Sequence, residues 1–188
     1  MIRTLKQATY NQADIVRGLR KGQQWAQLAF YDLYFEPAYH AAYRISRNQM
    51  DAEDAVHEGF IKAFAKINTL KKESAAESWL KRIIINETLH TLKSSRLFIQ
   101  LAEDEEEVPK EETENDLPTL KELNACINEL PEGYRIICQL FFIEEMKHEE
   151  IGQALGIAAS TSRSQLSRAK VHLQKVIRQN LKKYEREL

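Results

Sequence analysis

The sequence predicts an all-α fold of two small helical domains joined by an acidic, flexible linker. Apolar residues recur at helical rather than alternating spacing along almost the whole chain. Residues that interrupt helices are scarce, with six glycines and four prolines among 188 residues. The pattern breaks once, at residues 100–118, where an acidic stretch holds two of the four prolines and no aromatic residue. Such a segment cannot bury enough apolar surface to offset the entropy of ordering it.

The charge distribution supports a division into residues 1–96, 97–118 and 119–188. The whole chain carries a net charge of −1, but the first segment carries +5, the linker −8 and the last segment +2. Two basic flanks are therefore hidden by the average. For this reason the overall charge does not exclude a nucleic-acid partner.

Amphipathic patterns predict three early helices in the first domain, at residues 14–20, 25–34 and 37–46. The next helix is expected to begin with Asp51 as its N-cap and Asp54 as the acid of a capping box. Its buried face follows helical spacing through Val56, Phe60, Phe64 and Ile67.

A loop is predicted at residues 68–74, followed by a helix at about residues 75–95. The apolar residues of this second segment cover much of the helical circumference, which is typical of a helix buried among its neighbours. In the last domain, proline at the first helical turn indicates a helix that begins at Leu130-Pro131.

Residues 148–170 have the pattern of a helix-turn-helix. Gly152 is small where two short helices would cross, and Gly156 falls where the turn needs a left-handed residue. The second helix would turn Ser162, Leu166 and Ala169 inward. Ser162 occupies a position where Val or Ile would pack better. Ala158 stands where a Ser or Thr cap is expected, with Ser160 as the alternative cap.

The second helix of this motif has the composition of a reader of the major groove. Arginine can donate two hydrogen bonds to guanine, Ser and Gln offer shorter contacts, and the remaining basic groups neutralise phosphates. The predicted DNA-binding residues are Arg163, Ser164, Gln165, Ser167, Arg168 and Lys170. The alternative is an ordinary helical hairpin with a solvated basic face.

Other classes of function find little support. We find no Gly-rich phosphate loop, no metal-ligand spacing and no set of catalytic residues, so neither an enzyme nor a cofactor is expected. Cys126 and Cys138 are interpreted as buried thiols of a reducing compartment, with a disulfide or metal site as the alternative. The lack of a signal peptide and of a long apolar run predicts a cytoplasmic protein.

Both domains resemble the extracytoplasmic-function (ECF) group of bacterial sigma factors, the smallest members of the sigma-70 type. The likeness spans about residues 25–96 and 120–177. It is carried by DAEDAVHEGFIKAF and SWLKRIIINETLHTLKSSR in the first domain and by LPEGYR, EEIGQALGI and TSRSQLSRAK in the second. Two matches in the family's order, with an acidic linker between them, make the likeness specific.

The resemblance implies roles for the first domain. Asp54, His57 and Glu58 would dock on a coiled coil of the largest polymerase subunit, and would otherwise be a solvated strip. Asn86 would contact a base of the opened −10 element, with a satisfied core amide as the alternative. A basic cluster would meet phosphates of the melting duplex, although each member alone is typical of a solvated side chain. Its members are Lys71, Lys72, Lys81, Arg82, Lys93 and Arg96.

Four residues depart from the family's pattern. His57 replaces the usual Gln and Gly59 a bulky aliphatic residue, so the docking contact is expected to differ in strength. His90 stands where Asp is frequent, and Gln165 replaces an Arg, which alters the expected −35 sequence.

The resemblance also implies a role for the acidic linker at residues 97–118. The linker would thread through polymerase channels that otherwise hold nucleic acid, or serve only as a spacer.

The resemblance as a whole implies a transcription initiation factor that is not an enzyme and needs no cofactor. It would bind core RNA polymerase, read the −35 element as duplex and the −10 element as opened strand, and be masked by an anti-sigma factor. The alternative is a stand-alone dimeric helix-turn-helix regulator. A helical nucleic-acid enzyme and a structural adaptor are further rivals, which the two motifs disfavour.

Overall fold

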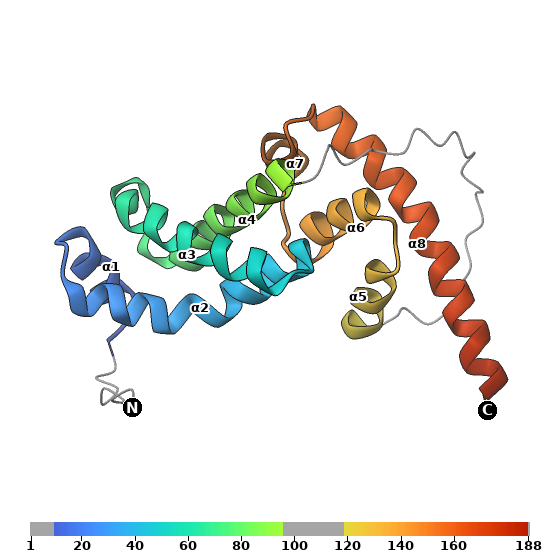
Figure 1. The fold of residues 1–188 in the computed structure, drawn as a ribbon, viewed down its shortest axis with the longest axis horizontal. Helices are drawn as coiled ribbons and strands as arrows, with labels where there is room; N and C mark the ends of the chain where they lie inside the picture. Colours follow the sequence, from blue (N-terminus) through green and yellow to red (C-terminus); the bar gives the residue numbers. More distant parts are fainter. Residues whose placement is uncertain (1–9, 96–118, 188) are drawn as a thin grey trace. The chain divides into compact units, whose positions relative to one another are not determined.

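The computed structural model describes residues 10–95 and 119–187, and the regular elements within these ranges are all helical (Figure 1). The all-α fold is therefore confirmed. The chain divides into two compact units, Met1–Ser95 and Arg96–Leu188. The predicted linker at residues 97–118 lies outside the described residues, so the predicted domain limits stay a prediction.

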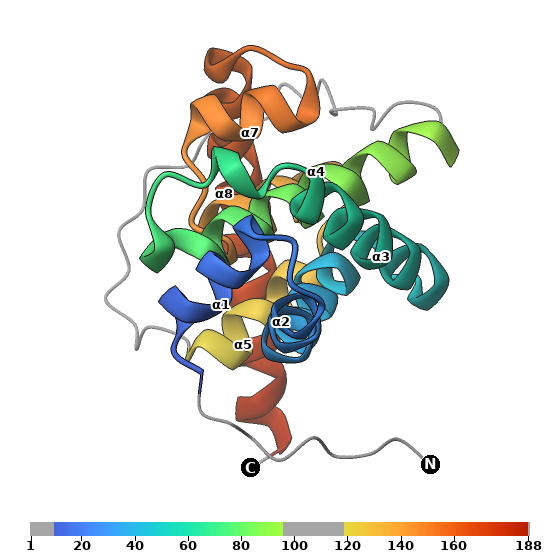
Figure 2. The ribbon, with the colours of Figure 1, turned by 90° about the vertical axis from the view of Figure 1, so that its left-hand side faces the viewer.

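The first unit is a bundle in which α2 (Gln24–Ser46), α3 (Gln49–Ala65) and α4 (Ala76–Ser95) pack against one another. A short helix, α1 (Gln12–Arg20), packs on α2 and contacts the connection between α3 and α4 (Figure 2). The bundle surrounds large apolar side chains that are almost fully buried, among them Phe30, Val56, Phe60, Leu80 and Ile84.

Residues 25–34 and 37–46 belong to one helix, so the prediction of two helices is wrong. Helix α2 runs through Pro37, where proline removes one main-chain donor and crowds the preceding turn. Buried residues on both sides of the proline, Phe30 and Tyr34 before it and Ala38 after it, belong to the same apolar core. Packing on the bundle thus overrides the helix-breaking tendency of proline.

Helix α3 begins two residues earlier than Asp51, and its N-cap is Asn48. The side-chain oxygen of Asn48 accepts a hydrogen bond from the backbone N–H of Asp51 at 3.2 Å. Asp51 therefore stands in the first helical turn, where a carboxylate is favoured by the positive end of the helix dipole. The prediction of a side-chain cap at this helix start is confirmed, but the capping residue is Asn48 and not Asp51.

The predicted loop consists of two single turns of 3₁₀-helix, η1 (Ile67–Thr69) and η2 (Glu73–Ala75), with Leu70, Lys71 and Lys72 between them. Helix α4 then follows at the predicted place. Its residues Ile84, Ile85 and Leu89 are buried, which confirms the expected burial of this helix.

The second unit contains α5 (Leu120–Asn128), α6 (Glu132–Cys138), η3 (Gln139–Ile143), α7 (His148–Leu155) and the long α8 (Ala159–Glu187). Helix α8 packs against α5, α6 and α7. The helix predicted from Pro131 ends at Cys138 and continues as one turn of π-helix. Within the described ranges, no helix is long and apolar enough to cross a membrane.

Cys126 and Cys138 are buried and free, as the thiol interpretation expects. Burial raises the pKa of the Cys138 thiol to about 12. A thiol with such a pKa stays protonated near neutrality and is a poor nucleophile. The described residues contain no group of three or more potential metal ligands.

Candidate nucleic-acid interface

The helix-turn-helix is formed by α7, a short turn and the start of α8. Gly156 ends α7 in the left-handed region with φ of 71°. A Cβ atom added to Gly152 would lie 2.8 Å from the carbonyl oxygen of Ile157, so a side chain there would collide with backbone. The N–H of Ile157 in turn donates to the carbonyl of Gly152 at 2.9 Å. Both glycine predictions are confirmed.

Helix α8 begins at Ala159, which places Ala158 just before its first turn. The carbonyl of Ala158 accepts from the N–H of Ser162 at 3.0 Å, but an alanine side chain cannot cap the free N–H groups. Ser160 lies inside the first turn and is not the N-cap. The helix start therefore lacks a side-chain cap at Ala158, as the sequence predicted.

The inner face of α8 is Ser162, Leu166 and Ala169, all buried as predicted. Ser162 is 0% exposed, and its hydroxyl oxygen lies 3.0 Å from Nδ1 of His148 in the first turn of α7. The imidazole of His148 also stacks on Phe141, with ring centroids 5.0 Å apart. Sequence reasoning missed His148, because its partner lies on the other helix of the motif.

Gln165 does not share the exposed face of α8 with the other predicted DNA-binding residues, and this burial contradicts its selection as a base-contacting residue. Its side chain is only 5% exposed, and its Oε1 atom has no hydrogen-bond partner in the described part of the protein. The physical reason is helical spacing. Gln165 follows Ser162 by three residues and precedes Ala169 by four, so it shares their buried stripe.

The outer face of α8 presents the other predicted residues. Arg163, Ser164, Ser167 and Lys170 are exposed, and Arg168 is partly exposed. Nη1 of Arg163 lies 3.4 Å from Oε1 of Glu149, the second residue of α7. The pKa of Glu149 is lowered, first by a hydrogen bond from its own backbone N–H and then by Arg163. Lys170 extends over the Phe142 ring, 5.9 Å from its centroid.

These contacts show which groups the exposed face of α8 can offer to DNA. The Arg163 side chain remains 56% exposed while it pairs with Glu149 of α7. Ser167 is exposed one helical turn after Arg163, and the neighbouring Ser164 is exposed with its hydroxyl donating to the carbonyl of Thr161 at 3.0 Å. A guanidinium flanked by hydroxyls can donate to base edges and phosphates in a major groove.

The described residues among those predicted to contact the −10 element lie in the connection between η1 and η2 and on α4. Lys71 and Lys72 are exposed between η1 and η2, and Arg82 and Asn86 are exposed one turn apart on α4. Because Asn86 is exposed, it is not a core amide. Lys81 is half-buried, the side chain of Lys93 is not described, and Arg96 lies outside the described residues.

The predicted docking strip, Asp54, His57 and Glu58, is exposed on α3. The His57 ring stacks on Phe35 of α2 with centroids 6.5 Å apart, and Glu58 pairs with Lys62 at 3.9 Å. Lys62 in turn pairs with Glu87 of α4 and ties the two helices together, and this hydrogen bond raises the pKa of Lys62.

An aromatic ladder on α2 continues from Phe35 and was not recognised from the sequence. Tyr31, Phe35, Tyr39 and Tyr43 follow one another at four-residue spacing, and successive rings lie 5.0, 6.2 and 6.0 Å apart. Exposed apolar side chains stand on the neighbouring α3, where Met50 is 70% exposed. The spacing alone could have revealed this stripe.

A helix-turn-helix with an arginine and hydroxyl face, together with a second helical unit that carries a basic loop, defines a DNA-binding protein. Comparison with known families gives its group. Residues 30–97 match the family model for sigma-70 region 2, and residues 120–173 match that for sigma-70 region 4. Together the two matches cover more than half of the chain.

Sequence comparison with individual proteins also finds ECF sigma factors. The chain is 34% identical over 142 residues to the ECF RNA polymerase sigma factor SigE of Mycolicibacterium smegmatis, covering 72% of this chain and 55% of that protein. It is 26% identical over 179 residues to the ECF RNA polymerase sigma factor SigW of Bacillus subtilis, covering 87% of this chain and 95% of that protein. The chain thus spans about half the length of SigE and nearly all of SigW.

The fold is also that of a solved sigma factor. RpoE of Bartonella quintana, crystallised with the anti-sigma factor NepR, superposes with a TM-score of 0.50 at 24% identity, covering 79% of this chain and 94% of that one. The chain belongs to the sigma-70 family, in its ECF group. It is therefore a promoter-specific transcription initiation factor, and the stand-alone dimeric regulator is not favoured.

Proposed function

We propose that this sigma factor binds core RNA polymerase and places two separate DNA readers on one promoter. The observation that carries the proposal is the arrangement of α7 and α8, which turns one arginine and hydroxyl face outward, in a chain whose other unit exposes lysines on a loop. Tethering both units to polymerase raises their effective concentration at DNA, so neither unit needs to bind tightly alone.

The second unit would read the −35 element as duplex through α8. Arg163, Ser164, Ser167, Arg168 and Lys170 would contact base edges and phosphates in the major groove. Gln165 is left out of this set because it is buried. An element bound by one helix and a few side chains is read with modest affinity, which suits a reader held in place by polymerase.

The first unit would capture the opened −10 element. Lys71, Lys72, Lys81, Arg82 and Asn86 would meet the backbone and a flipped base there, together with Lys93 and Arg96. Exposed amide and basic groups on adjacent elements suit a strand whose bases have left the duplex. Holding an extruded base offsets the few kcal/mol of unstacking that opening costs.

Partners are proposed from the same surfaces. Asp54, His57 and Glu58, beside the apolar side chains of α2 and α3, would dock on core polymerase. The Bartonella neighbour is bound by an anti-sigma factor, and we propose such an inhibitor for this protein too. The segment at residues 97–118 would join the two readers as an acidic linker. The protein would act in the cytoplasm, through binding alone, without catalysing a reaction itself.

The test is promoter-directed transcription with purified core polymerase and this protein. We expect start sites that depend on the −35 and −10 sequences, and a loss of −35 dependence in Arg163→Ala. The matched control is Arg178→Ala, which removes the same charge from an exposed position further along α8. If the protein neither binds core nor directs any start site, the proposal fails. Specific binding to a two-fold symmetric site without polymerase would support the dimeric regulator.

A further inference from the structure

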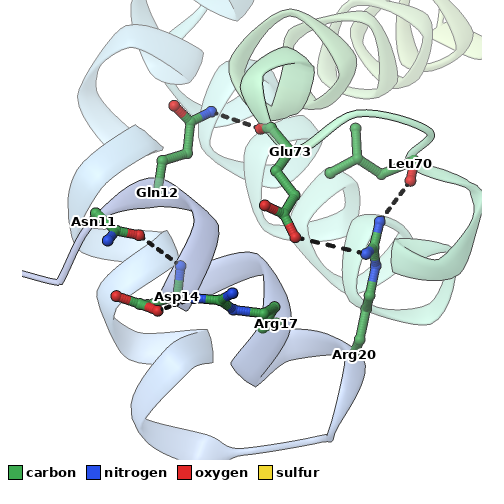
Figure 3. Close-up of polar contacts among 7 residues, drawn as sticks. All are labelled: Asn11, Gln12, Asp14, Arg17, Arg20, Leu70 and Glu73. Carbon is green, nitrogen blue, oxygen red and sulfur yellow. Dashed lines mark hydrogen bonds and ion pairs between the residues drawn. The ribbon is translucent and has the colours of Figure 1, made fainter.

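The loop between α3 and α4 is held from outside by α1 (Figure 3). Nη2 of Arg20, the last residue of α1, donates to the carbonyl oxygen of Leu70 at 2.8 Å. Nε2 of Gln12, the first residue of α1, donates to the carbonyl oxygen of Glu73 at 2.9 Å. Arg20 also lies beside the Glu73 carboxylate, with Nη1 and Oε1 3.8 Å apart. One helix therefore fastens the loop at two points.

The two fastened carbonyls flank Lys71 and Lys72. Leu70 itself is buried in the core of the first unit, whereas both lysines are exposed. The backbone is thus fixed immediately before and immediately after the lysine pair. A short segment with both ends fixed has few alternative conformations. The side chains of Lys71 and Lys72 therefore project from a defined position on the surface.

Helix α1 is itself firmly seated. Ile15, Val16 and Leu19 are buried in the same core cluster as Leu70, and the side chain of Asn11 caps the start of the helix at 2.9 Å from the N–H of Asp14. Arg20 and Gln12 therefore reach the loop from a rigid base.

We propose that Gln12 and Arg20 are positioning residues that set the place of Lys71 and Lys72 for recognition of the opened −10 element. This inference rests on the proposed function. Neither residue touches DNA in this scheme. Each acts through a backbone carbonyl of the loop, so its removal should alter opening and base preference at −10 while leaving the −35 contact intact.

The experiment compares polymerase holoenzymes containing wild type, Arg20→Ala, Arg20→Lys, Gln12→Ala and the control Arg17→Ala. Arg17 lies on the same helix, carries the same charge and pairs with Asp14 within α1. Promoter opening is followed with a fluorescent base analogue in the −10 element, on templates that differ only in −10 bases. Duplex binding to −35 DNA and affinity for core polymerase are measured alongside.

For Arg20→Ala we expect opening about tenfold weaker, since this corresponds to one hydrogen bond from a charged group. Discrimination among −10 variants should shrink, and −35 and core binding should match wild type. Gln12→Ala should show a smaller loss in the same direction. Arg20→Lys should show an intermediate loss of opening. The planar guanidinium of arginine can donate to the carbonyl of Leu70 and the carboxylate of Glu73 at once, whereas a single ammonium cannot do so in the same geometry. Arg17→Ala should behave like wild type.

A second measurement is amide hydrogen exchange in the free protein, at the N–H groups of Leu70 and Ala75, which bond within the loop. We expect faster exchange in Arg20→Ala and Gln12→Ala, a smaller increase in Arg20→Lys and no change in Arg17→Ala. Unchanged exchange would overturn the brace. Faster exchange with wild-type opening and −10 preference would overturn the positioning role. A wild-type holoenzyme that opens no promoter would instead overturn the proposed function, and the exchange result separates the two failures.

Discussion

The Nδ1 atom of His148, in the first turn of α7, lies 3.0 Å from the hydroxyl oxygen of the fully buried Ser162 of α8. This hydrogen bond joins the two helices of the DNA-reading motif at their N-terminal ends. It explains why a serine occupies a place that suits Val or Ile, since the hydroxyl has a partner there. The adjacent residues Glu149 and Arg163 form a second link between the same turns.

The His148 to Ser162 pair should couple energetically. Ser162→Val leaves the imidazole without its partner, and His148→Phe leaves a buried hydroxyl unpaired, so each should lower the free energy of unfolding by about 1–3 kcal/mol. The double variant should recover about 1 kcal/mol relative to the sum of the singles. Urea unfolding of the four proteins measures this coupling. Strict additivity would show that the two side chains do not interact, and Ser167→Val, at an exposed serine, is the control.

Gln165 should matter for stability but not for base recognition. Gln165→Met replaces a buried amide whose oxygen has no partner among the described residues, so we expect equal or greater stability, by up to about 1 kcal/mol. Discrimination between −35 variants should remain that of wild type. Thermal melting and transcription from −35 variants test both parts. A selective loss at one −35 base pair would show that Gln165 leaves its buried position to reach DNA.

Arg168, which is partly exposed, is the second arginine among the predicted base-reading residues of α8. If it donates both hydrogen bonds to a guanine, Arg168→Ala should cost about 1–3 kcal/mol on promoters that carry this base and nothing elsewhere. Competition among −35 variants in transcription assays measures the difference. An equal loss on every promoter, including those mutated at −35, would assign Arg168 to phosphate contact alone. Arg178→Ala serves again as the charge-matched control.

Gly152 should tolerate no side chain. Its added Cβ would press on the carbonyl of Ile157, which belongs to the turn and cannot move away like a flexible side chain. We expect Gly152→Ala to destabilise the second unit by about 1–3 kcal/mol and to weaken −35 reading with it. Gln153→Ala, on the exposed face of the same helix, should be nearly neutral. Similar unfolding free energies for both variants would contradict the close approach of the helices.

Cys138 should make stability fall at alkaline pH. Its pKa of about 12 in the folded protein, against an ordinary 9.0, means that the folded state holds the proton more tightly than the unfolded chain. The contribution is fully present below pH 9.0 and is lost as the pH rises toward about 12. Cys138→Ala should flatten this decline in urea unfolding at several pH values. An unchanged decline would place its origin in other groups.

The class of the fold and the site of DNA reading follow from local sequence. Helical spacing of apolar residues identifies α3, α4 and the two helices of the reading motif, because one buried face suffices to reveal a helix. Gly152 and Gly156 mark a close crossing and a left-handed turn, and both requirements are local. Ser162, Leu166 and Ala169 were likewise assigned to the buried face from spacing alone.

Three predictions were wrong, and only the first of them depends on packing against residues far away in the chain. Pro37 predicts a break, and only the packing of α2 on the bundle keeps that helix continuous. Gln165 has the polarity of a surface residue, and its place on the buried stripe was overlooked because residue type was weighed above position. The cap of α3 moved from Asp51 to Asn48, since two suitable residues stood close together.

The sequence by itself determined that the protein is helical, that it carries a DNA-reading motif, and which family it resembles. Only the tertiary structure decided how the readers are held. The bond between His148 and Ser162 and the grip of α1 on the loop carbonyls of Leu70 and Glu73 join residues with no signature in their own segments. A backbone carbonyl is present at every residue, so a contact to it leaves no trace in the sequence until the chain folds.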